Sequence, residues 1–406
     1  MSDQKKESNK KRTVIPIGPY HPLQEEPEYF QLHVEGEIVK KIEWRTSYNH
    51  RGIEKLSQSL NFDQVPYLAE RICGICSTSH PISYVNAVED ISEIQIPERA
   101  KYIRTIIAEL ERLHSHLLWV GLAGHFLGFN TVWMWAWKYR EPVLEIMEAT
   151  TGNRQNYAMM KIGGVRRDID NDDIPLIKKM LDDLKPKLDL LNGAVMDDPI
   201  IHARTKGIGI LTKEDAHNYG ALGPTARASG IKEDIRKDFP YAAYDMIKWN
   251  VITEEEGDVF AKVLVRIKEM YESVSIIDQC LDALKKSNGE IETKVKEIPP
   301  GDGIGQAEAP RGEVFHFVRS DGTNRPVRHK VRAPSFCNVP TFEVTTIEET
   351  ISDAAIILAA VDPCYCCTER MAVVDSGGKK IKDGDDLIKL SQEKTEKMRE
   401  SGKGNK

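Results

Sequence analysis

The sequence has no excess of charge of one sign. Its 406 residues include 56 Lys and Arg and 63 Asp and Glu, which gives a formal net charge of −7. Because such a balance leaves no strong positive field to attract phosphate groups, we do not expect the chain to bind nucleic acid. The composition also lacks the marks of disordered, collagen-like or disulfide-rich secreted chains. The chain is long enough for a large hydrophobic core with two or three subdomains.

A secretory signal is also missing, because no apolar stretch follows the basic residues of positions 1–12. We expect these residues to form a solvated, disordered tail. One segment, 117–137, has about the length of a membrane span, but it contains His125, Asn130 and three glycines and continues an amphipathic run that begins at Pro97. A buried helix of a large core is the better prediction. We therefore expect a protein without a transmembrane segment, in the cytosol or on a cytosolic face.

The pattern of apolar residues predicts an α+β fold that is mostly α, a central helical bundle with small antiparallel sheet regions at the periphery. A hairpin is expected at Glu35 and Gly36, and a long helix after Pro97. The expected regions are a β region at 13–60, a helical core at 61–287, a Gly- and Pro-rich β region at 288–345, a helix with a loop at 346–370, and a charged extension at 371–406. Within these regions helices are expected at about 132–150, 172–195, 212–219, 253–287 and 347–360, and strands in EVFHFVRS and VRHKVRA.

Seven cysteines, an odd number, argue against a disulfide framework. Cys73 and Cys76 form one C-x-x-C pair, and Cys364 and Cys367 form another. A local zinc ribbon would place its pairs about 15–20 residues apart, whereas nearly 300 residues separate these two. The fold must therefore bring its two ends together around one site. That arrangement suits a buried catalytic metal between helices, although a structural zinc or an iron–sulfur cluster also fits four thiolates.

Charged residues flank both pairs. Arg71 precedes the first pair and His80 follows it, whereas Asp362 precedes the second pair and Arg370 follows it. Cations near thiolates lower their pKa, and an Asp beside an Arg can fix the geometry of a site from outside the ligands. We predict that these residues support the cysteines, rather than serving separately as surface charges or helix caps.

The two cysteine pairs and their flanking residues resemble those of the large subunit of [NiFe]-hydrogenases, in the membrane-bound, energy-converting branch of that family. The resemblance covers about residues 13 to 372, with its motifs in order along the chain. The framework GPxHP, HRGIEK and EAPRGE also resembles the 49-kDa subunit of complex I, in which the cysteine ligands are missing. All four of these cysteines are present in this sequence. The motifs are GPYHPLQEEPEYF, HRGIEKL, YLAERICGICSTSH, ERAKYIRTIIAELERLHSHLL, TGNRQNY, KIGGVRRDI, GALGPTARASGIKED, GDGIGQAEAPRGEVFHFVRS and VDPCYCCTER.

The resemblance implies a Ni-Fe(CN)2(CO) centre. Cys73, Cys76, Cys364 and Cys367 would bind nickel, with Cys76 and Cys367 also bridging to an iron that carries one carbon monoxide and two cyanides. Cys366 lies off the motif, and we expect it to be a small packed residue, with a role as an alternative thiol left open. The two remaining cysteines, Cys280 and Cys337, are expected to be structural.

The resemblance also implies roles for four residues around the metals. Arg311, in EAPRG, would lie over the open metal position with Asp362 hydrogen-bonded to it. Glu26 would be the first proton acceptor, since a buried carboxyl with a raised pKa can shuttle protons; the adjacent Glu25 is the competing assignment. His80 would lie near the bridging thiolates.

Two further implications concern Glu54 and Arg370. Glu54, in HRGIEK, matches a carboxylate that supports a magnesium or another second metal in many relatives. That role is in doubt here, because Arg370 stands where soluble relatives have a C-terminal histidine. A maturation protease would cut after Arg370 and remove 371–406, with a retained tail as the alternative.

The implied activity is the reversible reduction of protons to hydrogen. No cysteines are left for a second cluster, so a small subunit carrying a [4Fe–4S] cluster is expected. The family implies further iron–sulfur subunits, ferredoxin as electron partner, antiporter-like membrane subunits, nickel-insertion proteins, and a peripheral place on the cytoplasmic side of the membrane. The alternatives are a complex I-like subunit that couples quinone or sulfur redox chemistry, and a structural zinc protein.

Overall fold

The computed structural model describes residues 12–22, 24–369, 373–375, 377, 379–382 and 384–401. The expected disordered tail, except for Arg12, and the expected cleavage position at Arg370 lie outside these residues. Over the part of the chain that is described, no helix is both long enough and apolar enough to cross a membrane.

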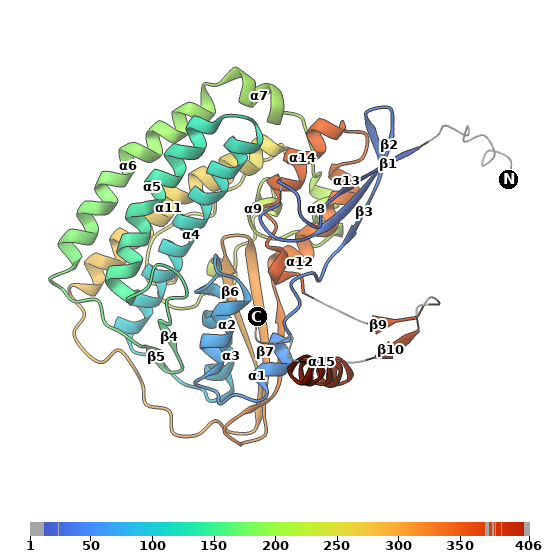
Figure 1. Ribbon diagram of the computed structural model, residues 1–406. Coiled ribbons are helices and arrows are strands. Elements are labelled where there is room, and N and C mark those ends of the chain that lie inside the picture. The colour runs from blue at the N-terminus through green and yellow to red at the C-terminus, as the bar shows by residue number, and fades with distance from the viewer. Residues whose placement is uncertain are drawn as a thin grey trace.

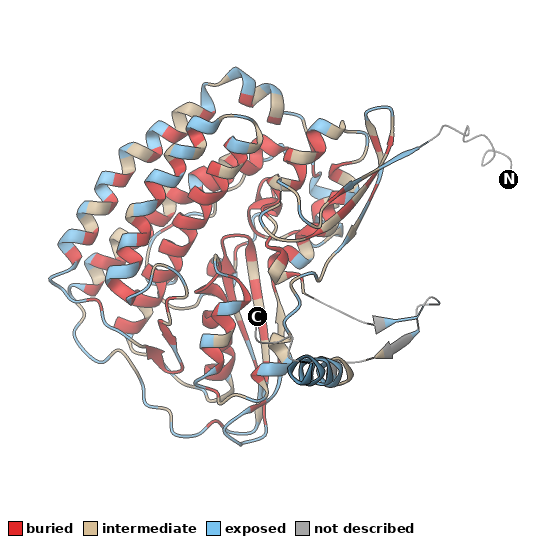
Figure 2. Cartoon of the chain, viewed as in Figure 1, coloured by how far each residue is buried: buried red, intermediate tan, exposed pale blue. Residues whose placement is uncertain are grey.

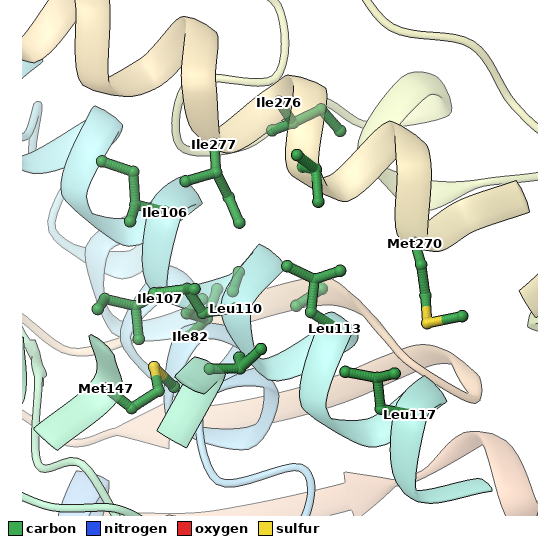
Figure 3. Packing of buried hydrophobic residues seen from close by; sticks show 14 of the residues in the cluster. Ile82, Ile106, Ile107, Leu110, Leu113, Leu117, Met147, Met270, Ile276 and Ile277 are labelled. Carbon is green, nitrogen blue, oxygen red and sulfur yellow. The ribbon is translucent and has the colours of Figure 1, made fainter. Parts of the chain in front are cut away.

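Four long helices form the helical centre of the fold, with α6 at its outer edge and α4 toward the middle of the molecule (Figure 1). They are α4 (Glu98–Phe126), α5 (Asn130–Thr151), α6 (Ile174–Met196) and α11 (Val259–Leu284). The inner faces of these helices are lined with buried residues (Figure 2). Figure 3 shows α4 side chains that recur every three or four residues and belong to this core, namely Ile106, Leu110, Leu113 and Leu117. This spacing explains why the segment is a helix and why it lies between α5 and α11.

The apolar segment 117–137 is not one buried helix, as its hydropathy predicts, but the end of α4 and the start of α5. Gly128 has a φ of 81°, which reverses the chain between the two helices. Gly124 lets them approach closely, because a Cβ there would lie 3.0 Å from Val132 Cγ1. Met134, in the second half of the segment, is 62% exposed.

Shorter helices connect these elements and cover the ends of the bundle (Figure 1). They are α1 (Ile53–Ser57), α2 (Val65–Ala69), η1 (Glu70–Ile72), α3 (Ser79–Ile91), α7 (Pro199–Thr205), α8 (Lys213–Asn218), α9 (Gly223–Arg227), α10 (Ile235–Asp238), α12 (Pro334–Asn338), η2 (Val339–Thr341), α13 (Phe342–Thr345), α14 (Ile351–Ala360), η3 (Tyr365–Cys367) and α15 (Gly384–Glu400).

Two three-stranded antiparallel sheets lie at the edges of the helical centre. The first contains β1 (Thr13–Ile17), β2 (Tyr29–Glu35) and β3 (Ile38–Arg45), with the expected hairpin turn at Gly36. The second contains β6 (Gly301–Ala309), β7 (Gly312–Ser320) and β8 (Pro326–Arg332). Two small hairpins pair β4 (Met160–Lys161) with β5 (Gly164–Val165) and β9 (Val373–Val374) with β10 (Lys380–Lys382). The predicted fold class is therefore confirmed.

Strand β6 is not predicted by the sequence, because GDGIGQAEA is rich in glycine, which disfavours strands. The structure shows why glycine is needed. A Cβ at Gly305 would lie 1.9 Å from the carbonyl oxygen of Ser83, and one at Gly303 would lie 2.0 Å from that of Ala87. Strand β6 thus lies directly against the backbone of α3, the helix that follows the first cysteine pair.

Candidate metal centre

The two cysteine pairs come together in one buried cluster, with Ala309 and Val314 of the second sheet. Cys364 Sγ lies 3.0 Å from Cys73 Sγ and 3.1 Å from Cys367 Sγ. Cys76, also buried, adjoins Cys73. The fold therefore joins its two ends around the cysteines.

Backbone amides donate hydrogen bonds in both turns that carry the cysteines. The amides of Ile75 and Cys76 donate to Cys73 Sγ at 3.4 Å, which favours a thiolate there. On the other side, the amide of Cys364 donates to Ser335 Oγ at 2.9 Å. Asp362, with a φ of 57°, turns the chain just before that cysteine.

Cys366 is not the packed residue expected from the sequence. Its Sγ lies 3.3 Å from Cys364 Sγ, and the compact group of potential metal ligands comprises Cys73, Cys364, Cys366 and Cys367. Cys366 Sγ also lies 2.8 Å from Glu26 Oε1. The short helix η3 explains this position, because it turns Cys366 and Cys367 toward the same cluster.

Arg311 and Asp362 form a buried ion pair beside the cysteines. Arg311 Nη2 donates to Asp362 Oδ1 at 2.5 Å, and its Nε donates to the backbone oxygen of Asp362 at 2.7 Å. Arg311 Nη1 lies 3.2 Å from Ser115 Oγ and 3.7 Å from Cys76 Sγ. Asp362 Oδ2 lies 4.0 Å from Arg266 Nε and makes no hydrogen bond among the described residues. The guanidinium is thus fixed by several contacts with one edge toward a thiol.

Three glutamates of the segment before β2 lie at or near the site. Glu26 accepts a hydrogen bond from the amide of Cys366 at 2.7 Å, and its Oε1 lies 4.0 Å from Cys364 Sγ. Burial and the nearby Cys73 raise the pKa of Glu26. Glu25 lines a cavity of about 20 Å³ together with Asp362 and Trp119, and burial raises its pKa to about 7. A cavity of this size holds about one water molecule.

Glu28 is the third of these glutamates, and its side chain is fully buried. Burial, with a smaller contribution from Glu369, raises its pKa to about 8. No sequence motif predicts a role for Glu28. The run of acidic residues in EEPE was the available signal, but no spacing rule distinguishes a buried glutamate from an exposed one there.

His80 faces the late cysteine pair from the start of α3. Its Nε2 lies 3.5 Å from Cys367 Sγ, and its Nδ1 lies 3.1 Å from His316 Nε2. Burial lowers the pKa of His80 to about 4, so the ring is neutral at physiological pH.

Other expected residues lie elsewhere. The Arg71 side chain does not support the thiols as expected; it is half exposed and donates to Glu70 Oε2 and to the backbone oxygen of Tyr67. Glu54 Oε1 accepts from the Val331 amide at 2.9 Å. Among the described residues, Glu54 belongs to no group of three or more ligand side chains.

Comparison with known proteins places this arrangement in a family. Residues 127–298 and 290–370 match the model described as the respiratory-chain NADH dehydrogenase 49 Kd subunit, and residues 51–122 match that of the nickel-dependent hydrogenases. The chain belongs to the family that contains the complex I 49-kDa subunit and the [NiFe]-hydrogenase large subunit.

Individual relatives cover nearly the whole chain. The chain is 41% identical to the membrane-bound hydrogenase subunit alpha of Pyrococcus furiosus, over 96% of this chain and 95% of the relative. It is 39% identical to the carbon monoxide-induced hydrogenase of Rhodospirillum rubrum, over 88% of this chain and 99% of that relative. One solved structure, of the membrane-bound sulfane sulfur reductase, an archaeal respiratory membrane complex, superposes on this chain with a TM-score of 0.85. The match covers 89% of this chain and 99% of the solved chain, at 31% sequence identity. The family thus includes both hydrogenases and complexes with other redox chemistry.

Proposed function

We propose that this chain is the catalytic large subunit of an energy-converting [NiFe]-hydrogenase, which interconverts two protons and two electrons with hydrogen. The observation that carries the proposal is the buried cluster formed by two distant cysteine pairs, with the Arg311 guanidinium beside it. A structural zinc site would need the four thiols but not the buried ion pair of Arg311 and Asp362.

The donor set fits a thiolate-held nickel–iron centre. Cys73, Cys76, Cys364 and Cys367 would hold it, since soft sulfur ligands suit nickel and iron. When bound, such a centre supplies the Lewis acidity and the redox capacity that hydrogen chemistry needs. The protein excludes bulk water around these sulfurs, because three of the four cysteines are almost fully buried.

The surrounding side chains would orient the reactants and move protons. Arg311, locked by Asp362, would present a fixed planar guanidinium toward the open side of the centre. Glu26 Oε1 would take a proton from the sulfur side, because it contacts the Cys366 thiol and lies close to the Cys364 sulfur. Its raised pKa lets the carboxyl group hold that proton before passing it on.

The proposal includes a set of partners. Electrons would pass to a small subunit with a [4Fe–4S] cluster and then to further iron–sulfur subunits and ferredoxin, and antiporter-like membrane subunits would use the energy released. The chain would lie peripherally on the cytoplasmic side of the membrane. Nickel-insertion proteins and a protease acting after Arg370 would complete it, and Glu54 would support a magnesium ion.

A second candidate is a subunit that couples sulfur or quinone redox chemistry to a membrane arm. The likeness to the sulfane sulfur reductase and the match to the 49-kDa model favour it. The two candidates differ in a measurable way, because only the hydrogenase needs nickel at the cysteines.

The substitution Cys367→Ser tests the proposal. We expect the purified complex to lose its nickel, because one soft ligand at the centre of the cluster is replaced by a hard hydroxyl. Cys280→Ser is the matched control, since Cys280 is a buried thiol of α11 outside the cluster. Elemental analysis that finds full nickel in the Cys367→Ser complex would overturn the assignment of this ligand.

A further inference from the structure

Arg311 lies in a two-residue turn between β6 and β7. Strand β6 ends at Ala309 and β7 begins at Gly312, and these two residues pair, so Pro310 and Arg311 alone form the turn. The residues of such a turn lie outside the ladder of hydrogen bonds between the two strands. Because Arg311 is buried and an unpaired buried carbonyl is costly, its backbone oxygen needs a donor from another part of the fold.

The side-chain amide of Asn338 is that donor. Asn338 is the last residue of α12, and it is only 1% exposed. Its Nδ2 donates to the backbone oxygens of Arg311 and Leu222, each at 3.2 Å, and its Oδ1 accepts from the Leu222 amide at 2.8 Å. All three partners are backbone groups, whose donor and acceptor roles are fixed, so only this orientation of the amide satisfies them. One side chain therefore joins the turn of Arg311 to the residue that precedes α9.

Two glycines let the turn and the start of α9 meet. Gly223 has a φ of 63°, and a Cβ there would lie 2.4 Å from the backbone oxygen of Arg311. Gly312 has a φ of 121°, and a Cβ there would lie 2.7 Å from the amide nitrogen of Gly223. Any other residue at either position would push the two backbones apart. The contact that Asn338 joins is therefore a direct one between two stretches of backbone.

The strand side of the turn is held separately, by Arg112 of α4. Its Nη2 donates to the backbone oxygen of Glu308 at 2.7 Å, and its Nη1 donates to that of Ala309 at 3.2 Å. Arg112 is itself buried and pairs with Glu109 at 3.2 Å. The end of β6 is thus attached to the helical centre, and Asn338 holds the turn at Arg311 itself.

Helix α12 also contacts the late cysteine pair. The Cys364 amide donates to Ser335 Oγ at 2.9 Å. Ser335 and Asn338 are three residues apart in α12, so their side chains leave the helix on the same side. The helix therefore fixes the turn of Arg311 relative to the loop that carries Cys364.

We propose that Asn338 is a positioning residue, which fixes the backbone of the turn and thereby the direction in which the Arg311 guanidinium points beside Cys76. Among the described residues, Asn338 makes no hydrogen bond to the guanidinium or to the cysteine cluster, so it acts through the backbone of Arg311. These contacts stand on their own geometry. Only the use of the guanidinium in hydrogen turnover rests on the proposed function.

The test is a high-resolution electron cryomicroscopy structure of the purified complex with Asn338→Asp. Aspartate has nearly the size of asparagine and can accept from the Leu222 amide, but it places an oxygen where two backbone oxygens need a donor. In the wild type Arg311 Nη1 lies 3.7 Å from Cys76 Sγ. We expect the variant to lengthen this distance by about 1 Å and to lower hydrogen turnover about 10²-fold at unchanged nickel content, since catalysis depends on such placement. Asn338→Ala, which removes the donors without adding a charge, should displace the guanidinium in the same way.

Thr345→Ala is the matched control, since Thr345 is a buried residue of α13 whose hydroxyl donates to the Thr341 backbone oxygen at 3.1 Å. It should lower the melting temperature, as the loss of a buried hydrogen bond does, and leave Arg311 in place. The proposal is overturned if the wild-type map shows the Asn338 amide away from the Arg311 oxygen. It is also overturned if the Asn338 variants lower the melting temperature while the guanidinium keeps its position. A displaced guanidinium in a complex without nickel would support the positioning role and contradict the proposed hydrogenase function.

Discussion

A buried ion pair lies beside the candidate centre, and each of its two charges depends on the other. The side chain of Arg311 is only 2% exposed, and Asp362 supplies its counter-charge. Isolated charges are costly in a protein interior, whereas a well-bonded pair is tolerated. The pair therefore holds a cation beside the thiols in one fixed orientation.

The substitution Arg311→Lys should leave nickel in place and lower hydrogen turnover by orders of magnitude. A lysine can keep one contact to Asp362, but it loses the planar fork that also reaches Ser115 and Cys76. Hydrogen evolution and nickel content of the purified complex measure the two effects. Arg319→Lys is the control, since Arg319 forms an exposed pair with Asp302. Full activity of Arg311→Lys would show that the guanidinium does not act at the open position.

The substitution Glu26→Gln should slow proton exchange without blocking assembly. The amide can still accept from the Cys366 backbone, but it cannot take up a proton. We expect the rate of isotope exchange between deuterium gas and water to fall by roughly 10²- to 10⁴-fold, the range typical of a lost proton-transfer group. Glu43→Gln, at an exposed glutamate of β3, should have no effect. An unchanged exchange rate in Glu26→Gln would favour Glu25 as the acceptor.

The spacing of the cysteines was enough to predict that the two pairs share one site. It did not predict that Cys366, His316 and His329 lie at or near that site. Cys366 joins the cluster because η3 turns it inward, and no spacing rule contains that information. His316 and His329 are on neighbouring strands, and their contact depends on the register of β7 and β8. Single-sequence patterns do not fix such a register, so the contact between these two histidines could not be predicted.

Strand β6 shows how an element positions the site. It ends at Ala309, two residues before Arg311, and its glycines let it lie against α3, which begins just after the first cysteine pair. The packing of this one strand therefore couples the guanidinium to the early cysteines. Helices α4, α5, α6 and α11 could be predicted from their apolar spacing, whereas β6 could not, because its glycines serve tertiary packing and oppose strand propensity.

The substitution Gly305→Ala should destabilise the protein by about 3 kcal/mol, because overpacking against a fixed backbone is costly. The added Cβ would meet the Ser83 oxygen at 1.9 Å, and neither backbone can easily move. Gly193→Ala, within α6, is the matched control: a Cβ there would lie 3.9 Å from Asp197 Oδ2, so stability should stay equal or rise. Denaturant unfolding of both variants measures the difference. Equal stability of the two would mean that β6 does not press on α3 as described.

At the scale of the whole molecule, buried ion pairs bind the helical centre to the second sheet. Arg227 of α9 pairs with Glu269 of α11 at 2.9 Å and with Glu308 of β6 at 2.8 Å. Arg236 of α10 pairs with Glu109 of α4 at 3.0 Å. Removing one partner of a buried pair typically costs about 3–5 kcal/mol, so these pairs fix how the elements meet. They hold β6, and with it Arg311, at the centre of the molecule.

The C-terminal part of the chain is attached differently. Helix α15 meets the rest of the molecule through an exposed ion pair of 3.1 Å between Lys55 and Asp385. Exposed pairs contribute little stability. The removal of residues 371–406 during maturation stays a prediction, and the proposed cleavage position after Arg370 lies outside the described residues.

The fold class follows from the sequence pattern, and the family from the order of its motifs, but neither decides between hydrogen chemistry and another redox reaction. Both alternatives share the fold, because the structure of the sulfane sulfur reductase superposes on this chain with a TM-score of 0.85. The difference lies in what the cysteine cluster holds, which is a property of the mature complex.

The most direct test is therefore elemental analysis of the purified complex, combined with infrared spectroscopy in the region of metal-bound carbon monoxide and cyanide. We expect nickel and iron in equal amounts in this chain, with one carbonyl and two cyanide bands that disappear in Cys367→Ser. Zinc or no metal in a fully assembled complex, without those bands, would contradict the hydrogenase assignment and favour the sulfur or quinone coupling subunit.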